Sequence, residues 1–398
     1  MRPSRLAQSV AMSETLAIDE KVRALQAAGT KVYGFGAGQP DAPTPEVACE
    51  AGIAAIRGGR TRYTSAAGTI ELRRAICQKL ARENGLAYEP DEILVTAGAK
   101  QAIFMALAVL VDPGDEVLVP APYWVSYPSQ IRMLGAVPKV VATDESTGFK
   151  LTPGMLHAAV SPRSRVLILN SPSNPTGAVY TPDEMKAVVG AALEHDLAIV
   201  SDEIYERILF GDARHVSPAS LSAQARERTG VVNGASKAYS MTGWRIGYLA
   251  APREWIAKAT AVQSHFCGNA CSISQDAAAA ALDQGADAVA AMVESFARRR
   301  DRVVALLGRA PDLELCPPEG AFYAFPDVSA YFGRSIQGRR IANDVDLAGY
   351  LLEEAHAAFV PGSGFGSDRH LRLSFACADA VIEEGLDATI RALEKLKR

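Results

Sequence analysis

The sequence predicts an α/β fold, with a large domain built on a mostly parallel seven-stranded sheet flanked by helices and a smaller α+β domain. Three observations support this prediction. The chain has 398 residues, a length typical of more than one domain. Short, nearly continuous apolar runs alternate with helical patterns, as expected of strands that helices cover on both faces. From about residue 288 onward, long helical patterns predominate and strands become few.

Seven apolar runs account for the predicted sheet. They are Ile93–Thr96, Glu116–Pro120, Ala136–Val141, Arg165–Asn170, Leu197–Ser201, Gly230–Asn233 and Ile246–Ala250. Helical patterns follow the first run, over Gln101–Val111, and the fourth run, over Thr181–His195. Pro182 stands in the first turn of the second of these helices, where its missing N–H costs nothing.

The C-terminal part of the chain has a different pattern. Helices are predicted over 288–307, Asp346–Ala357 and Ala380–Leu396, and strands over Gly320–Pro326 and Leu371–Phe375. We expect the N-terminal 40 residues to complete this smaller domain. The predicted division is an N-terminal arm over residues 1–45, a large domain over 46–287 and a small domain over 288–398.

The composition excludes several classes of function. A net charge of -4 gives no attraction to nucleic acid or to an anionic membrane, so neither is expected as a partner. There is no run of 18 apolar residues and no apolar core of a secretory signal near the first residue, so we expect a cytoplasmic protein. Of the six cysteines, Cys267 and Cys271 lie close enough to suggest a metal pair, but two further ligands are missing and no metal is expected.

Residues that can bind a ligand through a polar side chain or a backbone amide follow four of the predicted strands, where each strand ends. They are Gly98, Ala99 and Lys100 after the first strand, Asn174 after the fourth, Asp202 and Tyr205 after the fifth, and Ser236 and Lys237 after the sixth. Parallel sheets bind their ligands beyond the carboxyl ends of the strands. We therefore expect these side chains to meet at one edge of the sheet.

Part of this set suits a phosphate group. The backbone amides at the helix start after Gly98 can hold an anion. A hydroxyl from Ser236 and a guanidinium from Arg245 can bind the same anion.

The rest of the set suits an aromatic aldehyde with a basic ring nitrogen. Asp202 can face a cationic ring nitrogen, and Asn174 and Tyr205 can bind a phenolate oxygen. Trp124 offers a flat face for stacking on the ring. Lys237 can form an imine if its pKa is lowered. Phosphate, pyridinium and aldehyde together describe pyridoxal phosphate.

Taken singly, these residues have ordinary structural explanations. A lysine after a strand is usually a solvated charge, Asp202 can cap a helix, and Asn174 can form a turn. Their convergence at one sheet edge favours the functional interpretation.

At these residues the chain resembles the class I pyridoxal-phosphate aminotransferases of fold type I, over about residues 4–396. The motifs are GAGQPD (36–41), RYTSAAGTIELR (62–73), TAGAKQAI (96–103), PYWVSYP (122–128), NSPSNPTGAVY (170–180), SDEIYE (201–206), NGASKAYSMTGWRIGY (233–248) and RLSFA (372–376). Among the branches of the family, the chain is most similar to bacterial aspartate aminotransferases with a GxKQA sequence. That branch also holds prephenate-type enzymes.

The resemblance implies a catalytic set. Lys237 would carry the cofactor as a Schiff base and then move the α-proton of the substrate. Asp202 would keep the pyridine nitrogen protonated, and Tyr205 would contact the ring oxygen. The implied reaction is a ping-pong transfer of an amino group between an L-amino acid and a 2-oxo acid, with aspartate or glutamate and oxaloacetate or 2-oxoglutarate as the expected substrates.

The resemblance also implies the binding residues. The cofactor would contact Gly98, Ala99, Lys100, Trp124, Asn174, Asp202, Tyr205, Ser236, Lys237 and Arg245, together with Tyr63 of a neighbouring subunit. The α-carboxylate of the substrate would bind Arg372, in a pocket lined by Gly38, Trp124 and Asn174, and Lys100 would hold the distal carboxylate. The expected assembly is a homodimer with shared active sites.

Some positions depart from the family pattern. Gln39 replaces the glutamate of GEPD, and the YTPxxG sequence becomes TSAAG, which keeps Gly68. The branch usually has small Ser or Thr residues where Phe266, Cys267 and Gly268 stand, near the distal end of the substrate. Ala11 replaces a usual lysine, which argues against prephenate. An aromatic or another amino acid therefore stays an alternative substrate, and prephenate is included among the alternatives.

The sequence also bears on three other classes of function. The same scaffold can serve a non-transaminating enzyme, such as an amino-acid oxidase, a decarboxylase or a lyase. The GFGAG sequence at 34–38 is not the GxGxxG of a nucleotide-dependent dehydrogenase and opens no βαβ unit. A non-catalytic regulator is disfavoured because every cofactor group is retained.

Overall fold

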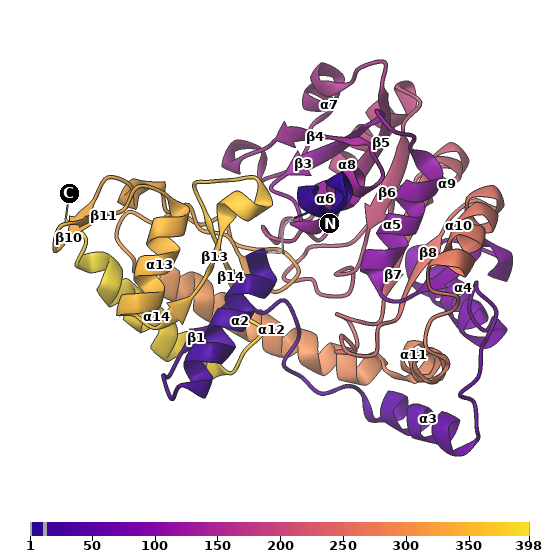
Figure 1. Cartoon of the computed structure of the whole chain (residues 1–398), viewed down its shortest axis with the longest axis horizontal. Helices are drawn as coiled ribbons and strands as arrows, with labels where there is room; N and C mark the ends of the chain where they lie inside the picture. The colour runs from indigo at the N-terminus through magenta and orange to yellow at the C-terminus, as the bar shows by residue number, and fades with distance from the viewer. Residues whose placement is uncertain (1, 11–13, 398) are drawn as a thin grey trace.

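The computed structural model describes residues 2–10 and 14–397, and it has two lobes (Figure 1). The larger lobe contains a seven-stranded sheet, and the smaller lobe contains the C-terminal helices and short strands. The predicted α/β fold class is therefore confirmed. The predicted departure at Ala11 lies outside the described residues.

The large sheet has the strand order β2-β8-β7-β6-β5-β3-β4. Its strands are β2 (Ile93–Thr96), β3 (Glu116–Ala121), β4 (Val137–Ala142), β5 (Ser164–Asn170), β6 (Ala198–Asp202), β7 (Thr229–Gly234) and β8 (Gly247–Ala250). Strand β8 pairs antiparallel with both β2 and β7, while the pairs among β3, β4, β5, β6 and β7 are parallel. All seven predicted strands are present, and the sheet is mostly parallel as predicted.

Helices cover both faces of this sheet, which explains the continuous apolar runs. Val117 and Val119 pack with helices α5 (Ala99–Leu110), α6 (Ser126–Met133) and α10 (Arg253–Phe266) on one face. Leu118, between them in β3, packs with α7 (Pro153–Ala159), α8 (Pro182–Glu194) and α9 (Ala223–Arg228) on the other face. This alternation follows from the two-residue period of a strand.

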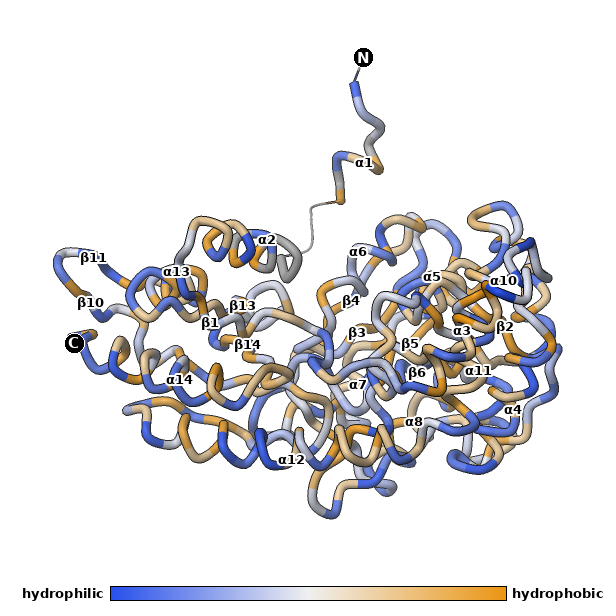
Figure 2. Tube along the Cα trace, turned by 90° about the horizontal axis from the view of Figure 1, so that it is seen from below, coloured by the Kyte–Doolittle hydropathy of each residue, from blue (hydrophilic) through white to orange (hydrophobic). Residues whose placement is uncertain are grey.

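The remaining helices complete the two lobes, except for α1. They are α1 (Arg5–Ser9), α2 (Glu14–Ala27), α3 (Glu46–Arg57), α4 (Ile70–Asn84), α11 (Ser272–Gln284), α12 (Ala286–Leu307), α13 (Asp344–Glu354) and α14 (Asp379–Glu394). Helix α12 runs from the large lobe into the small one (Figure 1), and α1 stands clear of both lobes (Figure 2). Short 3-10 helices are η1 (Pro90–Glu92), η2 (Glu145–Thr147), η3 (Pro218–Ser220), η4 (Ser329–Tyr331) and η5 (Gly362–Phe365).

The small lobe is built on short strands against α12, α13 and α14. Its strands are β1 (Tyr33–Gly34), β9 (Tyr323–Ala324), β10 (Ser335–Ile336), β11 (Arg339–Arg340), β12 (Ala357–Ala358), β13 (Val360–Pro361) and β14 (Leu371–Ser374). Strand β1 pairs with β12, so the N-terminal segment joins this lobe. The division at residues 45 and 287 stays a prediction; α12 begins at Ala286, just before the second boundary.

Two predicted elements of the small lobe were too long. The helix predicted over Asp346–Ala357 ends at Glu354, because His356 has a φ of 53° and the next residues form β12. A left-handed residue ends a helix and lets the chain turn into a strand. The strand predicted over Gly320–Pro326 is regular only at Tyr323–Ala324, since Ala321 has a φ of 59°. Along 2–10 and 14–397, no helix combines the length and the apolarity that crossing a membrane requires.

Candidate active site

A cavity of about 670 Å³ lies between the lobes, beyond the ends of β5, β6 and β7. Most of the predicted site residues line it: Gly38, Ala99, Lys100, Trp124, Asn174, Asp202, Tyr205, Ser236, Lys237, Arg245 and Arg372. They come from segments far apart in the sequence, and the carboxyl ends of the parallel strands bring them together. The volume falls in the range of small-molecule sites.

One part of the cavity is suited to an anion. Helix α5 begins at Ala99, and its N-cap Gly98 has a φ of 85°. A Cβ on Gly98 would stand 2.4 Å from Nη2 of Arg245, so only glycine lets this guanidinium approach the helix start. Arg245 is held there by bonds from Nη1 to the Thr242 carbonyl (3.0 Å) and from Nη2 to the Ala97 carbonyl (3.2 Å). The helix N-terminus and the guanidinium together favour a phosphate.

Asp202 ends β6 as a buried carboxylate at the cavity wall. Its Oδ2 accepts a 2.7 Å hydrogen bond from the Tyr127 hydroxyl, and its Oδ1 accepts one from the Ile204 amide at 3.3 Å. Burial raises the pKa of Asp202 to about 6, and the nearby Glu203 carboxylate adds to this shift. A cationic ring nitrogen would offset both effects and stabilise the ionised form.

The next residue, Glu203, does not line the cavity and is fixed behind Asp202. Its Oε1 accepts hydrogen bonds from the hydroxyls of Ser201 (2.8 Å) and Ser217 (2.6 Å), and its Oε2 lies 3.0 Å from Nε2 of His215. Burial lowers the pKa of His215, but Glu203 outweighs this effect and the pKa is raised overall. Because a buried carboxylate with three partners resists movement, these contacts hold the end of β6 in place.

Glu206 is fixed in the same way behind Tyr205. It is paired with the buried Lys79 and accepts a 2.7 Å hydrogen bond from Nδ2 of Asn84. Burial raises the pKa of Glu206, but Lys79, His215 and Asn84 together outweigh this effect and the pKa falls to about 2. Glu203, Glu206 and His215 stand close enough to hold a metal ion, but the Lys79 ammonium already pairs with Glu206 and offsets one of the two carboxylate charges.

Lys237 follows β7 and reaches into the cavity, where its ammonium donates a hydrogen bond to the Gly38 carbonyl. Burial, together with the positive charges of Arg372 and Arg245, lowers the pKa of Lys237 to about 8. Burial and Arg245 also lower the pKa of Lys100. The cavity is therefore rich in cations, and anionic ligands would relieve their mutual repulsion.

Arg372 reaches the cavity from β14 of the small lobe and is only 2% exposed. Its Nη1 donates a hydrogen bond to Oδ1 of Asn174 (3.2 Å), and its Nη2 donates one to the Gly36 carbonyl (2.6 Å). The guanidinium also stacks over the rings of Tyr323 (4.5 Å) and Phe365 (5.0 Å). A buried guanidinium oriented in this way can bind a carboxylate through two hydrogen bonds.

Two tyrosines of the site were missed at the sequence level. Tyr127 bonds Asp202, and the hydroxyl of Tyr323 lies 2.8 Å from that of Tyr205. Tyr127 stands three residues after Trp124 in the PYWVSYP sequence, and this closeness to a predicted site residue is the signal that could have found it. Tyr323 comes from the short strand β9, and its position had no comparable signal.

Other predicted residues lie elsewhere. Tyr63 is 98% exposed and does not line the cavity, and Gly98 lies against Arg245 just behind the lining. Phe266 and Cys267 line a neighbouring cavity of about 600 Å³, which shares Lys100 and Arg245 with the first cavity. The departure at Phe266 and Cys267 therefore lies beside the site, whereas the departure at Gln39 is part of its lining.

These residues fit pyridoxal phosphate. A Cβ on Gly98 would clash with the Arg245 guanidinium, and Arg245 lines the same cavity as Ser236 and the first residues of helix α5. The buried Asp202 has a raised pKa, and a cationic ring nitrogen beside it would stabilise its ionised form. An amine with a lowered pKa, Lys237, lines the same space.

Comparison with known proteins agrees with this geometry. The sequence matches the family described as aminotransferase class I and II over residues 30–388. It is 44% identical to the aspartate aminotransferase of Streptomyces avermitilis over 398 residues, which is 100% of this chain and 97% of that protein. It is 46% identical to the aspartate/prephenate aminotransferase of Cereibacter sphaeroides over 374 residues, which is 94% of each chain.

A solved structure shows the same fold. The crystal structure of the aspartate aminotransferase from Rhizobium meliloti matches with a TM-score of 0.96 at 43% identity, over 100% of both chains. The family match, the relatives and the site geometry lead to one conclusion. The chain belongs to the class I and II aminotransferases, and it is a pyridoxal-phosphate-dependent enzyme that acts on amino acids and 2-oxo acids.

Proposed function

We propose that this enzyme transfers the amino group between aspartate or glutamate and the 2-oxo acids oxaloacetate and 2-oxoglutarate, by a ping-pong mechanism. The observation that carries the proposal is that Lys237, Asp202 and Arg372 line a single cavity. These three groups provide an amine, a carboxylate for a cationic ring and a carboxylate-binding guanidinium.

The cofactor would be held by groups already in place. The Ala99 amide, Ser236 and Arg245 would bind its phosphate, and Asp202 would bind its ring nitrogen. Asn174 and Tyr205 would bind the ring oxygen, and Trp124 would lie against the ring. When bound, pyridoxal phosphate supplies an aldehyde that links to amines and a ring that withdraws electrons from the adjacent carbon.

The protein's own groups then control the proton. With a pKa of about 8, the Lys237 amine is partly neutral at physiological pH and can accept the α-proton of the amino acid at Nζ. Arg372 would hold the α-carboxylate, which fixes the direction of the α C–H bond relative to Lys237. Asp202, buried beside Tyr127, keeps its negative charge next to a cationic ring.

Lys100 supports a dicarboxylic substrate. It lines the same cavity as Arg372, with its ammonium 4.9 Å from the centre of the Trp124 ring. A second cation suits the distal carboxylate of aspartate or glutamate. The names of relatives that are 44–46% identical point to the same substrates.

An aromatic substrate is the second candidate. The Phe104 and Phe266 rings lie 5.8 Å apart in the neighbouring cavity, which opens beside Lys100. One related protein is named for prephenate as well as for aspartate. An aromatic oxo acid, or the non-aromatic oxo acid prephenate, is therefore the alternative acceptor.

We also propose that the enzyme is a cytoplasmic homodimer, with Tyr63 completing the phosphate site of its partner. The support is the position of Tyr63, a tyrosine exposed on the surface of a single chain, together with exposed apolar side chains on the same lobe, Ile56 and Phe266. The cysteines of the described chain are free, as in a reducing compartment. A mass of one chain in light scattering would contradict the dimer.

The substrate is tested by single-turnover reactions of the holoenzyme with each of the twenty amino acids. Loss of the absorbance band of the bound cofactor reports each reaction. Among the twenty amino acids, aspartate and glutamate should show the highest second-order rate constants for this reaction. Preference for phenylalanine or tyrosine would favour the aromatic alternative, and release of CO2, ammonia or peroxide would refute transamination.

A further inference from the structure

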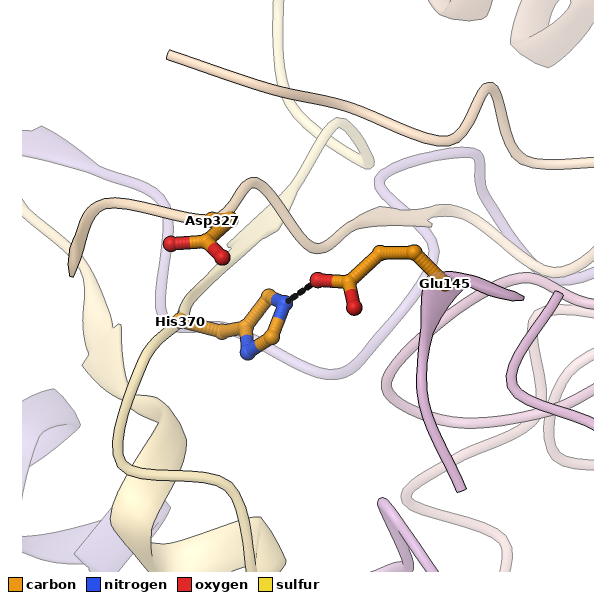
Figure 3. Close-up of side chains that lie close together, drawn as sticks. All are labelled: Glu145, Asp327 and His370. Carbon is orange, nitrogen blue, oxygen red and sulfur yellow. Dashed lines mark hydrogen bonds and ion pairs between the residues drawn. The ribbon is translucent and has the colours of Figure 1, made fainter. Parts of the chain in front are cut away.

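Glu145, Asp327 and His370 meet where the two lobes touch (Figure 3). Glu145 begins η2, which follows β4 of the large lobe, whereas Asp327 and His370 belong to the small lobe. The Nε2 atom of His370 lies 2.7 Å from Oε1 of Glu145. This hydrogen bond crosses from one lobe to the other.

The His370 ring is held on every side. Its plane stacks on Phe325 of the small lobe, with ring centres 4.6 Å apart at an angle of 5°. Phe149, from the same large-lobe segment as Glu145, meets the ring edge-on at 5.5 Å. Nδ1 lies 2.7 Å from the Ser367 hydroxyl. The ring therefore fits between groups of both lobes.

The partners define the protonation state of His370. A carboxylate can only accept, so Nε2 donates to Glu145, and Nδ1 can accept from Ser367. Burial lowers the pKa of His370, and the positive charge of Arg369 lowers it further. Glu145 and Asp327 raise the pKa but do not reverse this shift, so the neutral form is favoured. Both ring nitrogens are satisfied and the Arg369 guanidinium pairs with Asp327, so protein groups fill the cluster and a metal ion is not required.

This contact stands next to Arg372. His370 precedes β14 by one residue, and Arg372 is the second residue of that strand. Residues two apart along an extended chain point to the same side. Both side chains accordingly cross to the large lobe, His370 to Glu145 and Arg372 to Asn174. The two contacts hold one short strand at neighbouring points.

We propose that the bond between His370 and Glu145 positions Arg372 for the α-carboxylate of the substrate, which makes both residues positioning residues. The inference rests on the proposed role of Arg372. Without the bond, β14 and its guanidinium would lose one anchor to the large lobe. Carboxylate binding would weaken, while the groups that hold the cofactor and move the proton would be unaffected.

The test is a double-mutant cycle on the holoenzyme with Glu145→Ala, His370→Phe and the double variant. Phenylalanine keeps the stacking on Phe325 but removes the hydrogen bond. We expect each single variant to raise the KM for aspartate about 5- to 10-fold with kcat changed less than about 2-fold. The double variant should be no worse than either single one, because both remove the same bond.

Two controls separate positioning from structural damage. Glu145→Gln keeps an acceptor and should restore a KM within about 2-fold of wild type. Arg369→Ala removes the neighbouring ion pair with Asp327 but leaves the bond between the lobes, so its KM should also stay within about 2-fold. β-Alanine, which is aspartate without its α-carboxylate, should react equally with wild type and every variant.

Arg372→Ala is measured in parallel. If it leaves the KM for aspartate unchanged, the proposed role of Arg372 fails. If it raises the KM but Glu145→Ala does not, or if the single effects add in the double variant, the positioning role of His370 and Glu145 is overturned. Should His370→Phe not fold, Glu145→Ala and Glu145→Gln still decide, since Glu145 is partly exposed.

Discussion

The Tyr127 hydroxyl donates a 2.7 Å hydrogen bond to Oδ2 of Asp202, although 75 residues separate them. The bond joins helix α6 to the end of β6 and lies entirely in the buried interior. It stabilises the ionised carboxylate and so opposes the effect of burial on the Asp202 pKa.

Tyr127→Phe should therefore raise the pKa of Asp202 in the cofactor-free protein above about 6. Cofactor binding requires ionised Asp202, so the affinity of the protein for pyridoxal phosphate should fall as the pH drops through the pKa of Asp202. We expect the midpoint to move up by about half to one pH unit in the variant. The measurement is the dissociation constant of pyridoxal phosphate between pH 5 and 8. Ionisations of the free cofactor are common to both proteins, so an unchanged midpoint would show that the bond does not tune Asp202.

Asp202→Asn should stabilise the cofactor-free protein at pH 7. The folded pKa of about 6 is above the ordinary 3.8, so the folded state holds the proton more tightly and loses stability as pH rises between these values. Removing the charge should add about 3 kcal/mol to the free energy of unfolding at pH 7 and almost nothing at pH 3. Urea unfolding at both pH values measures this. Equal effects at pH 3 and pH 7 would contradict the assignment.

Lys100→Met should reduce the preference for dicarboxylic substrates. Loss of a charged hydrogen bond costs about 1.5–3 kcal/mol, so the kcat/KM for aspartate should fall about 10- to 100-fold. Alanine has no distal carboxylate, and its kcat/KM should change less than about 3-fold. Steady-state assays with both amino acids give the ratio. A parallel loss for alanine would place Lys100 in cofactor binding alone.

Glu206→Ala should destabilise the fold strongly, because it leaves the buried Lys79 ammonium without this partner. Removing one member of a buried ion pair costs about 3–5 kcal/mol. Arg298→Ala is the matched control, since its pair with Glu294 is exposed on α12 and should matter by less than about 0.5 kcal/mol. Urea unfolding compares the two, and similar losses would refute a special role for the buried pair.

The sequence predicted the elements whose patterns are local. All seven strands of the large sheet show continuous apolar runs, and the ends of four of them carry Lys100, Asn174, Asp202 and Lys237 into one cavity. The rule that parallel sheets bind ligands at the carboxyl ends of their strands predicted that these positions meet, whereas the order of the strands is known only from the structure.

The features that escaped prediction depend on distant contacts. The bond from Tyr127 to Asp202, and the one from His370 to Glu145 across 225 residues, have no local pattern. The short strands of the small lobe, such as β9 and β12, have too few residues for a two-residue period to be visible. The contact of Tyr63 with a second subunit stays a prediction.

Single-turnover kinetics of the Lys237→Ala holoprotein decide whether Lys237 is the amine that holds the cofactor and moves the proton. With aspartate, the wild-type enzyme should lose the cofactor absorbance band and release one equivalent of oxaloacetate per site. The variant should bind the cofactor but react at least about 10²- to 10⁴-fold more slowly. A Lys237→Ala protein that produces oxaloacetate at the wild-type rate would show that Lys237 is not the amine that moves the proton.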